Sequence, residues 1–134
     1  MENKNVVLSS MVMIQFIFLV FQFLLGMWIS LFVPLNITPG YHMHMFFLVP
    51  SVMAHMMLGF LLLLFSILII IFAVISGKIV AIFSSIFNLI FVFIAGISGI
   101  YFMLSGYTAD IFSFTMAAGF IGVVTTDFVI LLFN

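Results

Sequence analysis

The sequence predicts an all-α integral membrane protein, built as a four-helix bundle whose helices run up, down, up and down. Of its 134 residues, 68% are hydrophobic and only 4% are charged, whereas a soluble domain has about 25% charged residues. Four apolar runs each exceed the about 20 residues that a helix needs to cross the hydrocarbon core. The predicted single transmembrane domain covers residues 1–134, with helices at roughly 6–33, 50–76, 79–104 and 111–133.

The same composition excludes several classes of protein. Five formal charges cannot cover a water-facing surface, which excludes a soluble monomer. Two lysines and no arginine cannot neutralise a phosphate backbone, so we expect no nucleic-acid binding. The absence of cysteine excludes disulfides, thiolate metal sites and a cysteine nucleophile.

The first run follows Lys4, as the hydrophobic region of a signal peptide would. It is longer than the usual 7–15 residues of such a region, and no A-x-A-like cleavage site follows it. We therefore expect it to remain as the first helix. It ends before PLNITPGYH, where Pro34, Pro39 and Gly40 favour a turn. Pro50 is compatible with residues 41–49 either extending the second helix or lying along the interface.

The remaining runs are separated by short turns, at Gly77-Lys78 and at residues 105–110. Short connections predict that consecutive helices are antiparallel neighbours. Lys4 and Lys78 then share one side of the membrane, and the positive-inside rule places that side in the cytoplasm. Both termini are therefore predicted to be cytoplasmic, with residues 34–49 and 105–110 outside.

Polar side chains inside the spans are the first functional candidates, because they are costly in hydrocarbon. Asp127 is the only acid within a span, and Gln15, Ser66 and Asn88 lie at a comparable depth on the other three helices. A buried polar cluster of these four residues is the predicted site. It has three interpretations: a proton or cation pathway, a neutral Asp127 that joins helices by hydrogen bonding to Asn88, or a contact with another protein.

The histidines lie toward the other side of the membrane, among several methionines. His42 and His44 are candidate ligands for a soft metal such as Cu(I), or interfacial residues with one solvated end. His55 lies about five residues inside the second helix, and Met116 lies equally deep on the fourth. A His55–Met116 pair has the chemistry of a haem b clamp. The alternative is that His55 hydrogen-bonds a neighbouring helix.

The chain resembles small four-helix prokaryotic membrane proteins that look like one half of a haem A synthase. Four segments carry this resemblance: GMWISLFV (26–33), HMMLGFLLLL (55–64), AGISGIYF (95–102) and MAAGF (116–120). The resemblance implies a multi-pass protein of a prokaryotic cell membrane that binds haem b. Of the histidines that bind haem in these synthases, only His55 has a counterpart here, because the fourth run contains no histidine. Asp110 lies in an outer loop but does not match the catalytic acid, so catalysis is not implied.

Three functions follow from these observations. The first is an accessory or structural subunit of a membrane assembly, in contact with the lipid bilayer and with other subunits or a second copy. The second is a haem- or metal-binding redox module that uses His55. The third is an oligomeric transporter or channel subunit that uses Asp127. No Ser-His-Asp arrangement, phosphate-binding glycine loop or paired carboxylates can be assembled, which argues against an enzyme.

Overall fold

The computed structural model describes residues 2–33 and 49–133, and this part of the chain forms four α-helices. They are α1 (Glu2–Phe32), α3 (Pro50–Ser76), α4 (Ile79–Leu104) and α5 (Asp110–Phe133). Each is long and apolar enough to cross a membrane. The all-helical, multi-pass membrane class predicted from composition is therefore confirmed.

Two helices differ slightly from their predicted bounds. α1 begins at Glu2 rather than near residue 6 and ends at Phe32, and α5 begins at Asp110 rather than at 111. The predictions followed the apolar runs, but backbone hydrogen bonding continues into the polar residues beyond them. An acidic residue is also favourable in the first turn of a helix, where the macrodipole is positive. The prediction for residues 34–48 falls outside the described residues.

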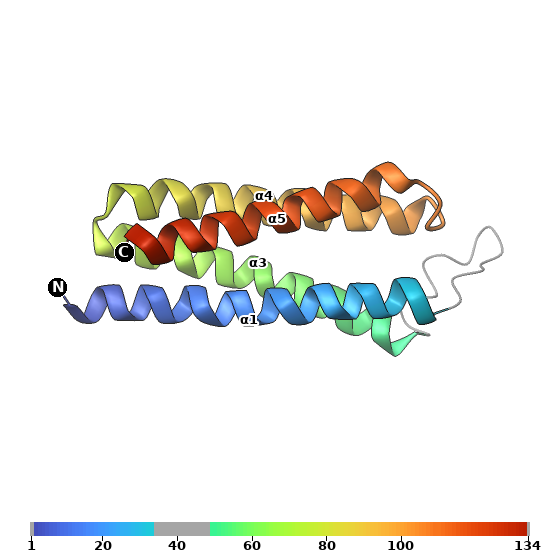
Figure 1. Ribbon diagram of the computed structural model, residues 1–134, viewed down its shortest axis with the longest axis horizontal. Coiled ribbons are helices and arrows are strands. Elements are labelled where there is room, and N and C mark those ends of the chain that lie inside the picture. The colour runs from blue at the N-terminus through green and yellow to red at the C-terminus, as the bar shows by residue number, and fades with distance from the viewer. Residues whose placement is uncertain (1, 34–48, 134) are drawn as a thin grey trace.

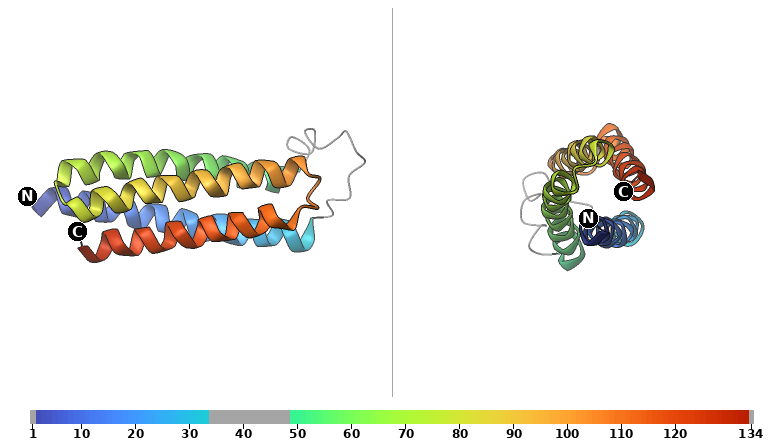
Figure 2. Two further views of the ribbon diagram at one scale, coloured as in Figure 1. Left: turned by 90° about the horizontal axis from the view of Figure 1, so that it is seen from above. Right: turned by 90° about the vertical axis from the view of Figure 1, so that its left-hand side faces the viewer.

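The four helices follow one another around a ring in the order α1, α3, α4, α5 (Figure 2, right). Each packs against the next, α1 closes the ring against α5, and the pairs α1–α4 and α3–α5 are diagonal. The start of α1, the end of α5 and the α3–α4 turn lie at one end of the bundle, and the α4–α5 turn lies at the other (Figure 1). Diagonal helices can therefore contact each other only through side chains that cross the interior of the bundle.

Both short turns use left-handed backbone. Gly77 has φ 74° and donates its N–H to Ala73 O and Val74 O, which caps the end of α3. In the α4–α5 turn, Gly106 and Tyr107 have φ 71° and 62°. The Tyr107 ring packs edge-on against Phe102, and burial raises the pKa of its phenol.

Inward-facing residues recur along the helices at alternating spacings of four and three, as in α1, where Leu8, Val12, Gln15 and Leu19 are all buried. This spacing keeps one face of each helix toward the bundle axis. The apolar members form two core layers. The first contains Leu8, Val12, Ile69, Ala73, Ala81 and Ile130. The second contains Leu19, Leu62, Val92 and Val123.

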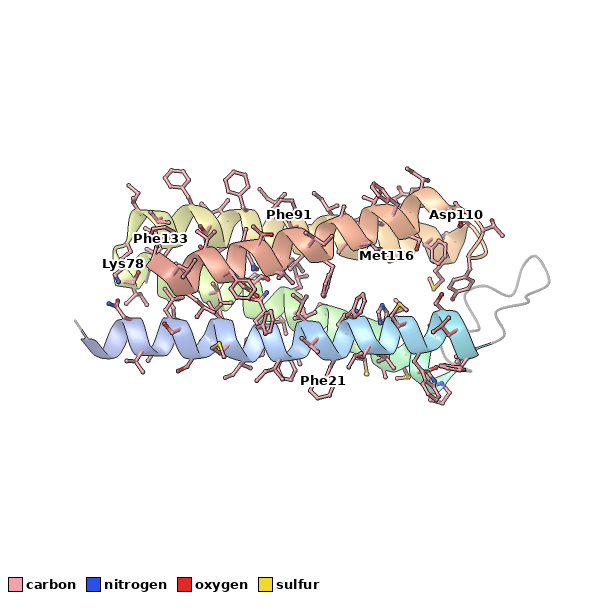
Figure 3. All side chains as sticks on the ribbon, viewed as in Figure 1. Phe21, Lys78, Phe91, Asp110, Met116 and Phe133 are labelled. Carbon is pink, nitrogen blue, oxygen red and sulfur yellow. The ribbon has the colours of Figure 1, made fainter. Side chains whose placement is uncertain are left out.

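Helices α4 and α5 approach closely because glycines line their contact. A Cβ added at Gly119 would lie 2.9 Å from the Ala95 Cβ and 3.0 Å from the Phe91 carbonyl oxygen. One added at Gly122 would overlap the Phe91 ring, which is labelled in Figure 3. Small residues of this kind allow helix backbones to pack tightly in a membrane. The α4–α5 pair is thereby held as a closely packed hairpin.

Candidate functional site

The four polar residues predicted to cluster lie together in the centre of the bundle. Gln15 on α1, Ser66 on α3, Asn88 on α4 and Asp127 on α5 each have 0% exposure. They occupy inward positions between the two apolar core layers, so the helix spacing that buries the neighbouring leucines and valines also buries them. With Thr126, which the sequence did not predict, they form one hydrogen-bonded group that we call the polar network.

Asn88 is the centre of the polar network. Its Oδ1 accepts from Gln15 Nε2 at 3.0 Å and from Ser66 Oγ at 2.9 Å. Its Nδ2 donates to Asp127 Oδ1 at 2.7 Å and to Thr126 Oγ1 at 3.2 Å. One amide therefore links the α1–α3 pair on its oxygen side to α5 on its nitrogen side.

The remaining hydrogen bonds of the polar network join α1 to α3 and join two of its hydroxyl groups to backbone carbonyls. Gln15 Nε2 also donates to Ser66 Oγ at 2.9 Å. Ser66 Oγ lies 3.1 Å from Leu62 O, and Thr126 Oγ1 lies 3.0 Å from Gly122 O. Gln15 reaches Asn88 across a diagonal of the bundle, so the network joins helices whose backbones are not in contact.

Asp127 has no cationic partner within the described part of the chain. Lys78 lies at the same end of the bundle as Phe133 (Figure 3). It precedes Asn88 by ten residues, or about 15 Å along the helix axis. An unpaired carboxylate is very costly in an apolar interior, whereas a neutral carboxyl group needs only hydrogen-bond partners. This geometry favours the neutral, protonated acid.

His55 faces α1 rather than the bundle diagonal. Its Nε2 lies 3.2 Å from Gln22 Nε2, so the glutamine amide donates to the ring. A Cβ added at Gly26 would lie 3.1 Å from His55 Cε1, which shows that the glycine makes room for the imidazole. His55 Nδ1 has no partner among the described residues. The histidine therefore belongs to the α1–α3 contact.

Met116 occupies a different helix contact. Its sulfur would lie 3.2 Å from a Cβ added at Gly99, so it fills the space left by that glycine between α5 and α4. His55 and Met116 fill the spaces at two different glycines, and the His55 Nε2 that would ligate iron is already bonded to Gln22. These residues as arranged do not form a haem clamp. Haem binding stays a prediction.

The predicted metal ligands His42 and His44 lie outside the described residues. Within residues 2–33 and 49–133, no three His, Cys, Asp or Glu side chains lie close enough together to hold a metal ion. Comparison of the chain with protein-family models, with curated proteins and with solved structures gives no match.

Proposed function

We propose that the chain is a small membrane-embedded subunit that associates laterally with another subunit of a membrane assembly. One observation carries this proposal: the polar side chains of the described helices are largely used in bonds within the bundle, whereas the outer faces of the helices are apolar. Among the largest exposed side chains are Phe21, Phe60 and Phe114, at 60%, 62% and 71% exposure. Such a surface is suited to lipid and to other transmembrane helices.

We further propose an up-down-up-down bundle in a prokaryotic cell membrane, with both termini in the cytoplasm. Lys78 lies at the same end of the bundle as Phe133, and Asp110 lies at the opposite end (Figure 3). This arrangement supports a cytoplasmic position for that end, because basic residues favour the cytoplasmic side.

The outer surface has an open apolar groove along α1 and α3, and we propose this groove as the docking site. The α1–α3 groove is lined by apolar side chains of both helices: Phe18, Phe21, Leu24, Leu25, Trp28, Ala54, Met57, Leu58 and Leu61. From 18 to 28 it extends about 15 Å along α1, at 1.5 Å per residue. A groove parallel to two helices receives the ridge of a third. The proposed occupant is an uncharged transmembrane helix of a different subunit.

Filling the groove tests this proposal. Ala54 lies in the groove and Ala118 is exposed on α5, so Ala54→Phe and Ala118→Phe make the same change on two faces. A tagged chain is purified from its native membrane in mild detergent, and co-purifying subunits are identified by mass spectrometry. We expect Ala54→Phe to lose a stoichiometric partner that wild type and Ala118→Phe retain.

Other outcomes would replace the proposal. A monomer without partners, or equal retention in both variants, would contradict a docking site in this groove. Crosslinking of the chain only to itself would assign the groove to self-association. A Soret absorption band would favour the haem-binding alternative, and ion flux in proteoliposomes that Asp127→Asn abolishes would favour the transporter or channel.

A further inference from the structure

Two buried oxygens of the polar network have no hydrogen-bond partner among the described residues. They are Gln15 Oε1, on α1, and Asp127 Oδ2, on α5. Both side chains have 0% exposure, so bulk solvent does not reach them. Leaving a buried polar group without a partner costs about 1–3 kcal/mol. The pair of unpartnered acceptors is therefore the feature of the network that needs an explanation.

A count of hydrogens shows what is missing. The two hydrogens of the Gln15 amide go to Ser66 Oγ and Asn88 Oδ1, and those of the Asn88 amide go to Thr126 Oγ1 and Asp127 Oδ1. The hydroxyls of Ser66 and Thr126 have one hydrogen each, and each has acceptors within reach. Rotating either amide by half a turn would place like groups against each other. With the two amides in this orientation, no hydrogen of the network remains for the two oxygens.

The two residues approach the same amide from opposite sides. Gln15 Nε2 bonds the oxygen of Asn88, and Asp127 Oδ1 bonds its nitrogen. Their chain neighbours Phe16 and Phe128 meet in an edge-on contact with ring centroids 5.7 Å apart. Helices α1 and α5 are therefore in contact at the level of the polar network.

Asp127 is the only titratable member of the polar network. α1 contributes the amide of Gln15, α3 the hydroxyl of Ser66, α4 the amide of Asn88, and α5 the hydroxyl of Thr126. None of these carries a charge or exchanges one near neutral pH. A proton taken up here can therefore reside only on Asp127.

We propose that the polar network is a binding site for a single proton, held on Asp127 Oδ2 and hydrogen-bonded to Gln15 Oε1. The carboxylate takes up one proton and becomes a neutral carboxyl group, which removes the charge. The new O–H supplies the hydrogen that the network lacks. This inference is independent of the proposed subunit function.

Infrared spectroscopy of the full chain in lipid tests the proposal, because the chain has only three acidic side chains. We expect the C=O stretch of a protonated carboxyl group at neutral pH, which Asp127→Asn removes and Asp110→Asn leaves. Gln15→Leu withdraws the proposed acceptor and should shift this band to higher frequency. Ser66→Ala, which removes a different member, should leave its frequency unchanged. Gln15→Asn shortens the amide and provides a second test if Gln15→Leu does not fold.

Three results would overturn the proposal. The first is the absence of a protonated-carboxyl band that depends on Asp127. The second is a band whose frequency is the same in wild type, Gln15→Leu and Gln15→Asn, because Gln15 would then not receive the proton. The third is loss of the band when sodium or lithium is added at constant pH, which would assign the two oxygens to a metal cation instead.

Discussion

Removal of Asn88 should destabilise the bundle more than removal of any other single polar side chain of the network. Asn88→Ala eliminates four hydrogen bonds, to Gln15, Ser66, Thr126 and Asp127. Hydrogen bonds between helices in a membrane average about 0.6 kcal/mol, so four amount to about 2.4 kcal/mol. Leaving a buried carboxyl oxygen without a donor adds about 1–3 kcal/mol. We therefore expect the free energy of unfolding to fall by about 3.4–5.4 kcal/mol.

The assay is equilibrium unfolding in mixed micelles, with two controls. Ser85→Ala removes a buried hydroxyl one turn away, whose bond to Ile82 O stays within its own helix, and should cost less than about 1 kcal/mol. Asn88→Leu restores the lost volume without polar atoms and should remain destabilised, because its former partners are still unpaired. Equal stabilities for Asn88→Ala and Ser85→Ala, or full recovery in Asn88→Leu, would refute the reasoning.

Three further predictions concern helix contacts. Gly122→Ala should lower the free energy of unfolding by about 1–3 kcal/mol, because the added Cβ overlaps the Phe91 ring. A Cβ added at Gly96 meets no atom within 4 Å, so Gly96→Ala should not destabilise the bundle. Equal losses of unfolding free energy for the two variants in mixed micelles would contradict this. Gln22→Leu should lower the free energy of unfolding by about 0.6–1.7 kcal/mol, because it removes the hydrogen bond to His55. An unfolding midpoint equal to that of the wild type would contradict this prediction. Because Met116 fills the space left by Gly99 rather than pairing with His55, Met116→Leu should leave the visible absorption spectrum of protein from haem-replete cells unchanged. A Soret band that Met116→Leu abolishes would contradict this.

The depth of the site could be predicted from the sequence, because the rise per residue of a helix is fixed. Distances from the run ends placed Gln15, Ser66, Asn88 and Asp127 at one level, and the structure brings them together at that level. Depth does not say which groups bond, however. The central role of Asn88 and the participation of Thr126 depend on the rotation of each helix about its own axis.

The rotation of each helix about its axis also decides where the two residues proposed to bind haem point. His55 and Met116 lie at similar depths on diagonal helices, which is what the sequence suggested. Their side chains turn toward different neighbours because Gly26 and Gly99 provide the space that each one fills. A glycine in a transmembrane helix leaves room for a neighbouring side chain, but the sequence does not identify which side chain occupies that room.

The proposed lateral docking is tested most directly by photocrosslinking in the native membrane. Met57 lies in the α1–α3 groove, and Ile97 is exposed on α4 at the same distance from the helix end, so they form a depth-matched pair of probe positions. A photoreactive amino acid is placed at one position or the other. Docking in the groove predicts a single crosslinked partner of defined mass from position 57 and none from position 97. Identical crosslinks from both positions, or none from either, would contradict it.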